Sequence, residues 1–164
     1  MIFVTIGSAV KGIEFTRFIK KMDEIAGKID EEVIMQIGTV PYEPQHASFF
    51  TYCSYQESLK YFEKASLVVG HCGAGTVLNA LKFQVPIVVI PRRHQYGEHV
   101  DDHQVELAQK MEGIPNIHVV YEIENLESVI KRILGETKIA RQGGSFSERE
   151  KLIKSLKDFV DRWP

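Results

Sequence analysis

The sequence is poor in cysteine, has no excess of basic residues and contains no long apolar run. Its two cysteines, Cys53 and Cys72, are too few for a disulfide framework and lack the spacing of a zinc site, so we expect free thiols in a reducing compartment. A formal net charge of -2 offers nucleic acid no bulk attraction, and none is expected as a partner. No apolar stretch approaches the roughly 20 residues of a membrane-spanning helix. No basic segment precedes Ile2, so we also expect no secretory signal and a cytoplasmic location.

What is present is the composition of one ordinary globular domain. The 164 residues are 44% hydrophobic and 26% charged, which excludes intrinsic disorder. The charge is unevenly distributed, because residues 1–127 hold 11 basic and 17 acidic side chains whereas residues 128–164 hold 9 and 5. A basic end on an acidic body indicates contact with a membrane surface or an acidic partner.

Apolar periodicity predicts strands and helices that alternate along the chain. Short apolar runs predict strands at 2–6, 33–37, 47–52, 67–70, 86–90 and 117–121. Apolar residues at steps of three and four predict helices at 15–29, 76–83, 102–112 and 125–134, and a capping box at 54–57 opens a further short helix. Near-continuous apolar strands between amphipathic helices indicate a doubly wound, Rossmann-like α/β domain with one parallel sheet of about six strands.

The C-terminal part of the chain is expected to be separate from this domain. We divide the chain into a Rossmann-like domain at 1–134, a linker at 135–146 and an amphipathic helix at 147–164. Three glycines with polar neighbours favour a loop in the linker, and a capping box at 147–150 opens the helix. The apolar stripe of this helix packs either on the chain's own helices or against a partner or bilayer surface, and both alternatives stay open.

A glycine-rich turn follows the strand at 67–70. Gly73 and Gly75 flank Ala74 between a strand and a helix, and Thr76 comes next. Glycine lets a ligand approach the backbone closely, and the N–H groups at a helix start favour an anion such as a diphosphate. The turn is neither a dinucleotide fingerprint nor a P-loop. A tight turn that needs glycine only for packing is the alternative.

A polar segment follows the strand at 86–90. It gathers basic, acidic and amide side chains at Arg92, Arg93, His94, Glu98, His99, Asp101, Asp102, His103 and Gln104. Such a loop indicates a clamp for a polar ligand. A metal site is the alternative, because His99 and His103 would lie one turn apart on a helix. We assign no metal ligands, since an aspartate here can simply cap the following helix.

Four ordered segments resemble the family 28 glycosyltransferases. They are Phe3–Ser8, Gln36–Gly38, His71–Thr76 and Tyr96–Ala108, with a His-x-Gly-Ala-Gly-Thr motif and a later His-Gln-x-Glu-Leu-Ala motif. The chain is similar to the donor-binding half of these enzymes. It is most similar to stand-alone subunits of polysaccharide synthesis, which are related to the soluble subunit of the two-subunit dolichol-linked N-acetylglucosaminyltransferase. The resemblance implies half of a GT-B enzyme, with inverting, metal-independent transfer from a UDP-sugar and no cofactor.

The resemblance also implies a site. The residues that it places near the nucleotide, diphosphate or sugar are Gly7, Ser8, Lys11, Gln36, Gly38, His71, Gly73, Ala74, Gly75, Thr76, Asn79, Arg92, Tyr96, Glu98, His99, Asp102, His103 and Gln104. Many relatives carry Glu at the position of Asn79, where it holds the ribose. Ribose binding is therefore expected either to be weaker here or to depend on a neighbour such as Glu98. The catalytic base is expected on a partner, with His103 and Glu98 as the candidates in this chain.

The function implied is that of a donor-binding subunit. It would pass a hexose or N-acetylhexosamine from a UDP-sugar to a lipid-linked acceptor held by a membrane-anchored partner, which would also bring the chain to the membrane. One alternative is a non-enzymatic nucleotide-binding module that regulates a membrane partner. Another is a self-sufficient nucleotide-sugar enzyme that completes its site by dimerisation.

Overall fold

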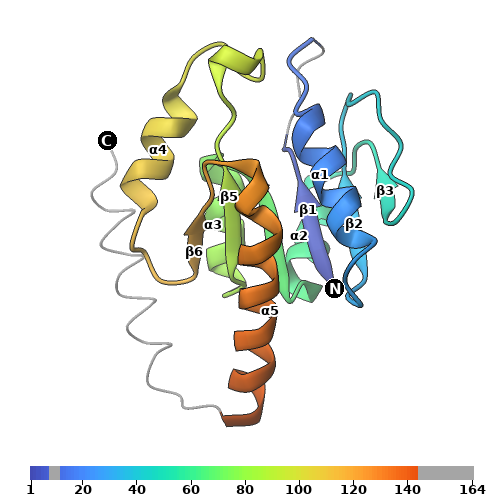
Figure 1. The fold of residues 1–164 in the computed structure, drawn as a ribbon, viewed down its shortest axis with the longest axis vertical. Helices are drawn as coiled ribbons and strands as arrows, with labels where there is room; N and C mark the ends of the chain where they lie inside the picture. The colour runs from blue at the N-terminus through green and yellow to red at the C-terminus, as the bar shows by residue number, and fades with distance from the viewer. Residues whose placement is uncertain (8–11, 144–164) are drawn as a thin grey trace.

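The computed structural model describes residues 1–7 and 12–143, and its core is one six-stranded parallel sheet (Figure 1). The strands are β1 (Ile2–Thr5), β2 (Val33–Gln36), β3 (Ser48–Phe50), β4 (Leu67–His71), β5 (Ile87–Ile90) and β6 (Ile117–Val119). Their order in the sheet is β3-β2-β1-β4-β5-β6, and every pairing is parallel. This is the strand order of Rossmann-type folds, so the predicted fold class is confirmed.

The strand order reverses at β1. Val4 lies opposite Met35 of β2 on one side and opposite Val69 of β4 on the other. The chain runs outward from β1 to β3 and then returns to continue from β4 in the opposite direction. The connections that follow β1 and β4 therefore lead to opposite sides, and a crevice forms between them at the carboxyl ends of the strands.

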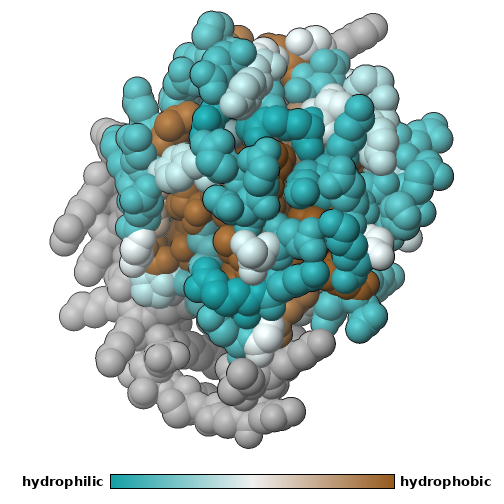
Figure 2. Space-filling model, in the orientation of Figure 1, coloured by the Kyte–Doolittle hydropathy of each residue, from teal (hydrophilic) through white to brown (hydrophobic). Residues whose placement is uncertain are grey.

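Helices cover both faces of the sheet. They are α1 (Thr16–Ala26), α2 (Tyr55–Lys64), α3 (Ala74–Lys82), α4 (His103–Met111) and α5 (Leu126–Gly143). α1 and α5 pack on one face and lie in front of the sheet in Figure 1, whereas α2, α3 and α4 pack on the other. The outward surface of the layer that contains α1 and α5 is mostly hydrophilic (Figure 2), as expected for amphipathic helices.

Two apolar cores result from this layering. Phe18 of α1 and Ile130 of α5 pack with Val4 on one side, and Phe62 of α2 packs with Phe3 on the other. Successive strand residues point to opposite faces, so Phe3 and Val4 serve different cores. Each of these buried side chains contributes about 1.5–3 kcal/mol to stability.

The loop 41–47 is held by Asp23, a buried carboxylate on α1. It accepts hydrogen bonds from the Tyr42 hydroxyl at 2.7 Å and from the backbone N–H groups of Gln45 and His46 at 2.9 and 2.7 Å. Burial alone would raise the pKa of Asp23, but these hydrogen bonds outweigh burial and lower it. The predicted capping box at the start of α2 is also confirmed, because Ser54 Oγ accepts from Glu57 N at 3.2 Å.

The structure corrects the predicted linker at 135–146. Helix α5 continues without a break from Leu126 to Gly143, so the helix expected to end at 134 is longer and most of the expected loop is helical. A single glycine such as Gly135 costs a helix only about 1 kcal/mol relative to alanine, and most of its neighbours are good helix formers. The helix predicted at 147–164 lies outside the described residues. Among the helices that are described, none combines the length and the apolar character needed to cross a bilayer.

Candidate functional site

A cavity of about 540 Å³ opens at the carboxyl ends of β1, β2, β4 and β5. It is lined by Thr5, Gly7, Gln36, Cys53, Tyr55, Ser58, Phe62, His71, Gly75, Thr76, Asn79, Arg92, His99 and Gln104. Its place between β1 and β4 is the position at which doubly wound sheets bind their ligands. It brings together residues that are up to 99 positions apart in the sequence.

His71 lies between the loops that follow β1 and β4. A β-carbon on Gly7 would come within 2.5 Å of its Cε1, and a β-carbon on Gly73 would also overlap the ring. Burial, reinforced by the charge of Arg92, lowers the pKa of His71 to about 3, so the imidazole is neutral at pH 7. Its Nδ1 is buried and has no hydrogen-bond partner among the residues that the structure describes.

Arg92 supplies a buried positive charge to the cavity. It is 5% exposed, and its Nη2 donates to the Ile6 carbonyl at 2.8 Å. Its backbone N–H donates to Gln104 Oε1 at 3.2 Å, which holds that buried amide against the cavity. Burial lowers the pKa of Arg92, although Glu98 opposes the shift, and a guanidinium stays charged in proteins. Its Nε is buried without a partner in 1–7 or 12–143, so one donor of this guanidinium is unused within the described residues.

Thr5 and Gln36 fix the turn that follows β1. The Thr5 hydroxyl donates a short hydrogen bond to Gln36 Oε1 and accepts one from Gly7 N at 3.0 Å. The Gln36 amide donates to the Gly7 carbonyl at 3.2 Å. These bonds hold Gly7 at a φ of 64°, a left-handed conformation that glycine adopts without strain.

The start of α3 faces the cavity without a side-chain cap. Gly73 is the N-cap residue and contributes no side-chain hydrogen bond, and the helix begins at Ala74, two residues before the predicted start. Gly75 and Thr76 line the cavity, and a β-carbon on Gly75 would meet nothing within 4 Å. The first N–H groups of the helix and its positive dipole end are therefore placed to receive an anion.

One wall of the cavity comes from α2 and the residues before it, which the sequence analysis missed together with Thr5. These residues are Cys53, Tyr55, Ser58 and Phe62. The Tyr55 hydroxyl donates to Asn79 Oδ1 at 3.2 Å, which joins α2 to α3 across the cavity edge. Burial raises the pKa of Cys53, so its thiol stays protonated at neutral pH. The sequence did contain one signal for this wall. Cys53 directly follows the strand predicted at 47–52, and the other candidate site residues also follow predicted strands.

Glu98 does not line the cavity. It is 3% exposed, its Oε1 lies 2.5 Å from Arg17 Nε, and its Oε2 accepts from the Arg93 N–H at 3.1 Å. Because the Glu98 carboxylate pairs with Arg17 and with a backbone N–H, it holds the turn after β5 in place. This placement argues against the alternative in which Glu98 replaces the missing ribose-binding glutamate.

Other predicted residues also lie outside the cavity lining. Tyr96 is 53% exposed, with the Arg17 guanidinium 4.9 Å from its ring centre. Asp102 accepts from the His94 N–H at 2.9 Å. The lining likewise leaves out Gly38, Gly73, Ala74 and His103. Ser8 and Lys11 fall in the segment that the structure does not describe.

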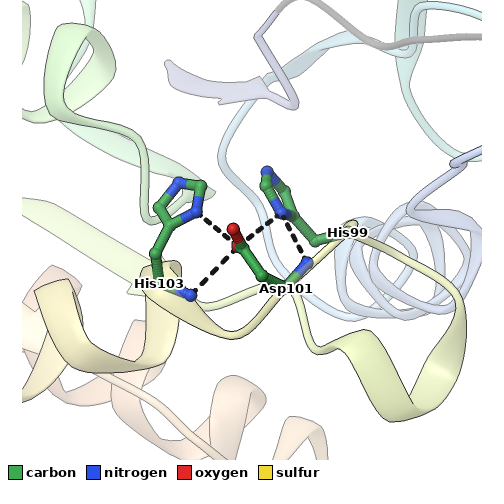
Figure 3. A group of neighbouring side chains, drawn as sticks. All are labelled: His99, Asp101 and His103. Atoms are coloured by element: carbon green, nitrogen blue, oxygen red, sulfur yellow. Dashed lines mark hydrogen bonds and ion pairs between the residues drawn. The ribbon is translucent and has the colours of Figure 1, made fainter.

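His99, Asp101 and His103 converge at the edge of the cavity (Figure 3). The Asp101 carboxylate lies between the two imidazoles, 3.1 Å from His99 Nδ1 and in a short contact with His103 Nδ1. Asp101 rather than Asp102 accepts from the first N–H of α4, at 3.2 Å. The two histidines do not lie one turn apart on a helix, as the metal-site alternative supposed, because α4 begins at His103, but their side chains meet.

The family model of the glycosyltransferase family 28 C-terminal domain matches residues 1–159. The chain therefore belongs to this family, and the resemblance read from its motifs is confirmed. Two curated relatives are each named UDP-N-acetylglucosamine transferase subunit ALG13. The protein of Candida albicans is 31% identical over 78 residues, and that of Homo sapiens is 38% identical over 84 residues. These matches span 47% and 48% of this chain but only 25% and 7% of the two relatives.

Solved glycosyltransferases share the fold. The calicheamicin glycosyltransferase CalG4 superposes with a TM-score of 0.60 at 17% sequence identity. The match covers 98% of this chain and 38% of CalG4. The chain thus has the Rossmann-like fold of one part of a GT-B glycosyltransferase.

Proposed function

We propose that this chain is the donor-binding subunit of a two-subunit inverting glycosyltransferase. It binds a UDP-sugar, while a membrane-anchored partner holds the lipid-linked acceptor that receives the hexose or N-acetylhexosamine. The observation that carries the proposal is that buried Arg92 and the uncapped start of α3 meet at one open cavity. The relatives named as N-acetylglucosamine transferase subunits support the same class of donor.

The diphosphate of the donor is proposed to bind between Arg92 and α3. Arg92 Nε is an unused, charged donor, and arginine forms strong, directional hydrogen bonds with phosphate oxygens. The N–H groups around Gly75 add donors and the positive end of the helix dipole. These groups also stabilise the charge that develops on the departing UDP. Since they supply positive charge where the diphosphate would lie, we propose that transfer proceeds without a metal ion.

The partner is proposed because, among the described residues, no carboxylate of the cavity lining is placed to act as the general base. Removal of the acceptor proton requires a group with a pKa near the working pH. No described residue of the lining carries a carboxylate, and His71, with a pKa of about 3, is too weak a base. Glu98 is paired with Arg17, so His99, which lines the cavity, and His103 beside it are the imidazoles of this chain that could serve in place of a base on the partner. The match covers 38% of CalG4, and the relatives named as transferase subunits support a second half on another chain.

The direct test is co-expression of this chain with candidate membrane proteins from the same organism. We expect the isolated chain to bind UDP but not NAD in a calorimeter, and to transfer sugar to a lipid extract only when the partner is present. Binding of UDP without transfer in any combination would instead favour a regulatory module. Turnover of a UDP-sugar by the isolated chain would contradict a divided enzyme.

A further inference from the structure

His99, Asp101 and His103 have the composition and geometry of a transition-metal site. Each offers one ligand atom, and these atoms all lie within 4.8 Å of one another. Around a tetrahedral ion with bonds of about 2.0–2.1 Å, ligand atoms are about 3.3 Å apart. His99 Nδ1 and Asp101 Oδ1 are already 3.1 Å apart, whereas His103 Nδ1, in a short contact with the same oxygen, has to move away from it to complete a three-ligand set.

The backbone holds the three residues together before any ion binds. His103 is the first residue of α4, and its N–H donates to Asp101 Oδ1 at 3.2 Å. The turn that carries His99 is fixed at its other end, because His94 N donates to Asp102 Oδ1 at 2.9 Å and His94 Nδ1 lies 3.2 Å from the His99 carbonyl. Preorganised ligands lower the ordering cost of binding.

We propose that His99, Asp101 and His103 bind one borderline divalent ion of the Zn²⁺ class at the mouth of the cavity. Two imidazoles and one carboxylate suit Zn²⁺, Co²⁺ or Ni²⁺, whereas Mg²⁺ and Ca²⁺ prefer sets of oxygen ligands. The side chains of Asp101 and His103 are 56% and 57% exposed, so water reaches the remaining coordination positions. The site is distinct from the diphosphate position proposed at Arg92 and α3, although His99 also lines the cavity.

The consequence for activity rests on the proposed function. An ion held here takes the one lone pair of each neutral imidazole, so neither His99 nor His103 can accept a proton or a hydrogen bond. Zn²⁺ should therefore inhibit transfer reversibly, and EDTA should restore it. If Zn²⁺ binds to the site but does not lower transfer, the predicted inhibition is wrong, whereas the proposed metal site is not contradicted.

Binding is tested on the full chain with Zn²⁺ alone, by competition with a chromogenic chelator. We expect one ion per chain, a loss of affinity of at least about tenfold in Asp101→Asn, and no binding at this site in the double variant His99→Gln/His103→Gln. Co²⁺ provides a second readout, because its visible absorption bands report the ligand set and should disappear in the double variant. Excess Mg²⁺ should not displace either ion.

His46→Gln is the matched control. His46 is an exposed histidine whose Nδ1 lies 3.6 Å from Asp23, so it forms an imidazole–carboxylate pair without a second imidazole. Its replacement, like Cys53→Ser, should leave Zn²⁺ affinity unchanged. Far-UV circular dichroism confirms that each variant is folded. A wild-type chain that fails to bind Zn²⁺, or a folded double variant that binds it as tightly as wild type, would overturn the proposal.

Discussion

The imidazole of His71 occupies the space that a side chain on Gly73 would need, and the same ring blocks a side chain on Gly7. One side chain at the end of β4 thus sets the distance between the two loops that border the cavity. The ring is buried and neutral, and it lies beside the charge of Arg92. Glycine at both positions is a packing requirement of His71, in addition to any role in ligand approach.

This packing predicts that Gly73→Ala destabilises the fold by about 1–3 kcal/mol through overpacking. Gly73 has a φ of -104°, which alanine adopts readily, so the cost comes from the ring and not from the backbone. In a His71→Ala background the same substitution should be nearly neutral, which urea unfolding of the four proteins measures as a coupling energy. Gly75→Ala is the control, because a β-carbon there meets nothing. Purely additive effects would contradict the contact.

The lowered pKa of His71 predicts a loss of stability in mild acid. The folded value is about 3, below the ordinary value of 6.5. Between these values the unfolded chain binds a proton that the folded chain does not, so stability falls with falling pH by up to about 1.4 kcal/mol per unit. His118 adds to this slope because burial lowers its pKa too. Urea unfolding at pH 7 and pH 5 should show about 2 kcal/mol less pH dependence in His71→Gln than in wild type. An unchanged slope would show that the ring protonates in the fold as readily as in the unfolded chain, and would contradict a lowered pKa.

Neighbouring arginines allow a paired test of the diphosphate position. Arg92 is buried in the cavity wall, whereas Arg93 Nη2 points away to the Tyr121 carbonyl and the Glu122 carboxylate at 2.9 Å each. Arg92→Lys should weaken UDP binding about tenfold or more, because lysine cannot reproduce the forked donors. Arg93→Lys should leave UDP affinity within about twofold. Equal effects at both positions would remove Arg92 from the proposed site.

Because α5 is uninterrupted, we can predict how a substitution at Gly135 changes the stability of the fold. A β-carbon on Gly135 meets nothing within 4 Å, and the residue lies inside the helix. Gly135→Ala should therefore raise the free energy of unfolding by about 0.5–1 kcal/mol, since glycine is the poorer helix former. Thermal unfolding measures this gain. Destabilisation would indicate that the segment is the loop originally expected from its glycines.

The fold could be predicted from the sequence because the strands and most helices carry strong periodicities. Four consecutive buried residues at Ile2–Thr5 and at Ile87–Ile90 are unambiguous strands in a parallel sheet. The helix starting at Ala74 was placed two residues late, because glycines disfavour a helix while the N-cap position tolerates them. The extent of α5 was missed because Gly135 was given more weight than the good helix formers around it.

The cavity could be predicted only in part, because spacing identifies the loops but not the direction of each side chain. Arg92 and Glu98 follow the same strand, yet one lines the cavity and the other pairs with Arg17 of α1. That pairing spans 81 residues of sequence and depends on how α1 packs. Tyr55 and Ser58 reach the cavity for a similar reason, since α2 lies beside α3 in the folded layer.

Binding of a nucleotide diphosphate at the start of α3 can be measured by calorimetry with UDP. Gly75→Val places a branched side chain in the open space of the cavity, and Gly135→Val makes the same change in a helix away from it. We predict that wild type and Gly135→Val bind UDP with equal affinity, whereas folded Gly75→Val shows no measurable binding. UDP affinity that is unchanged in folded Gly75→Val, or absent in wild type, would contradict the account.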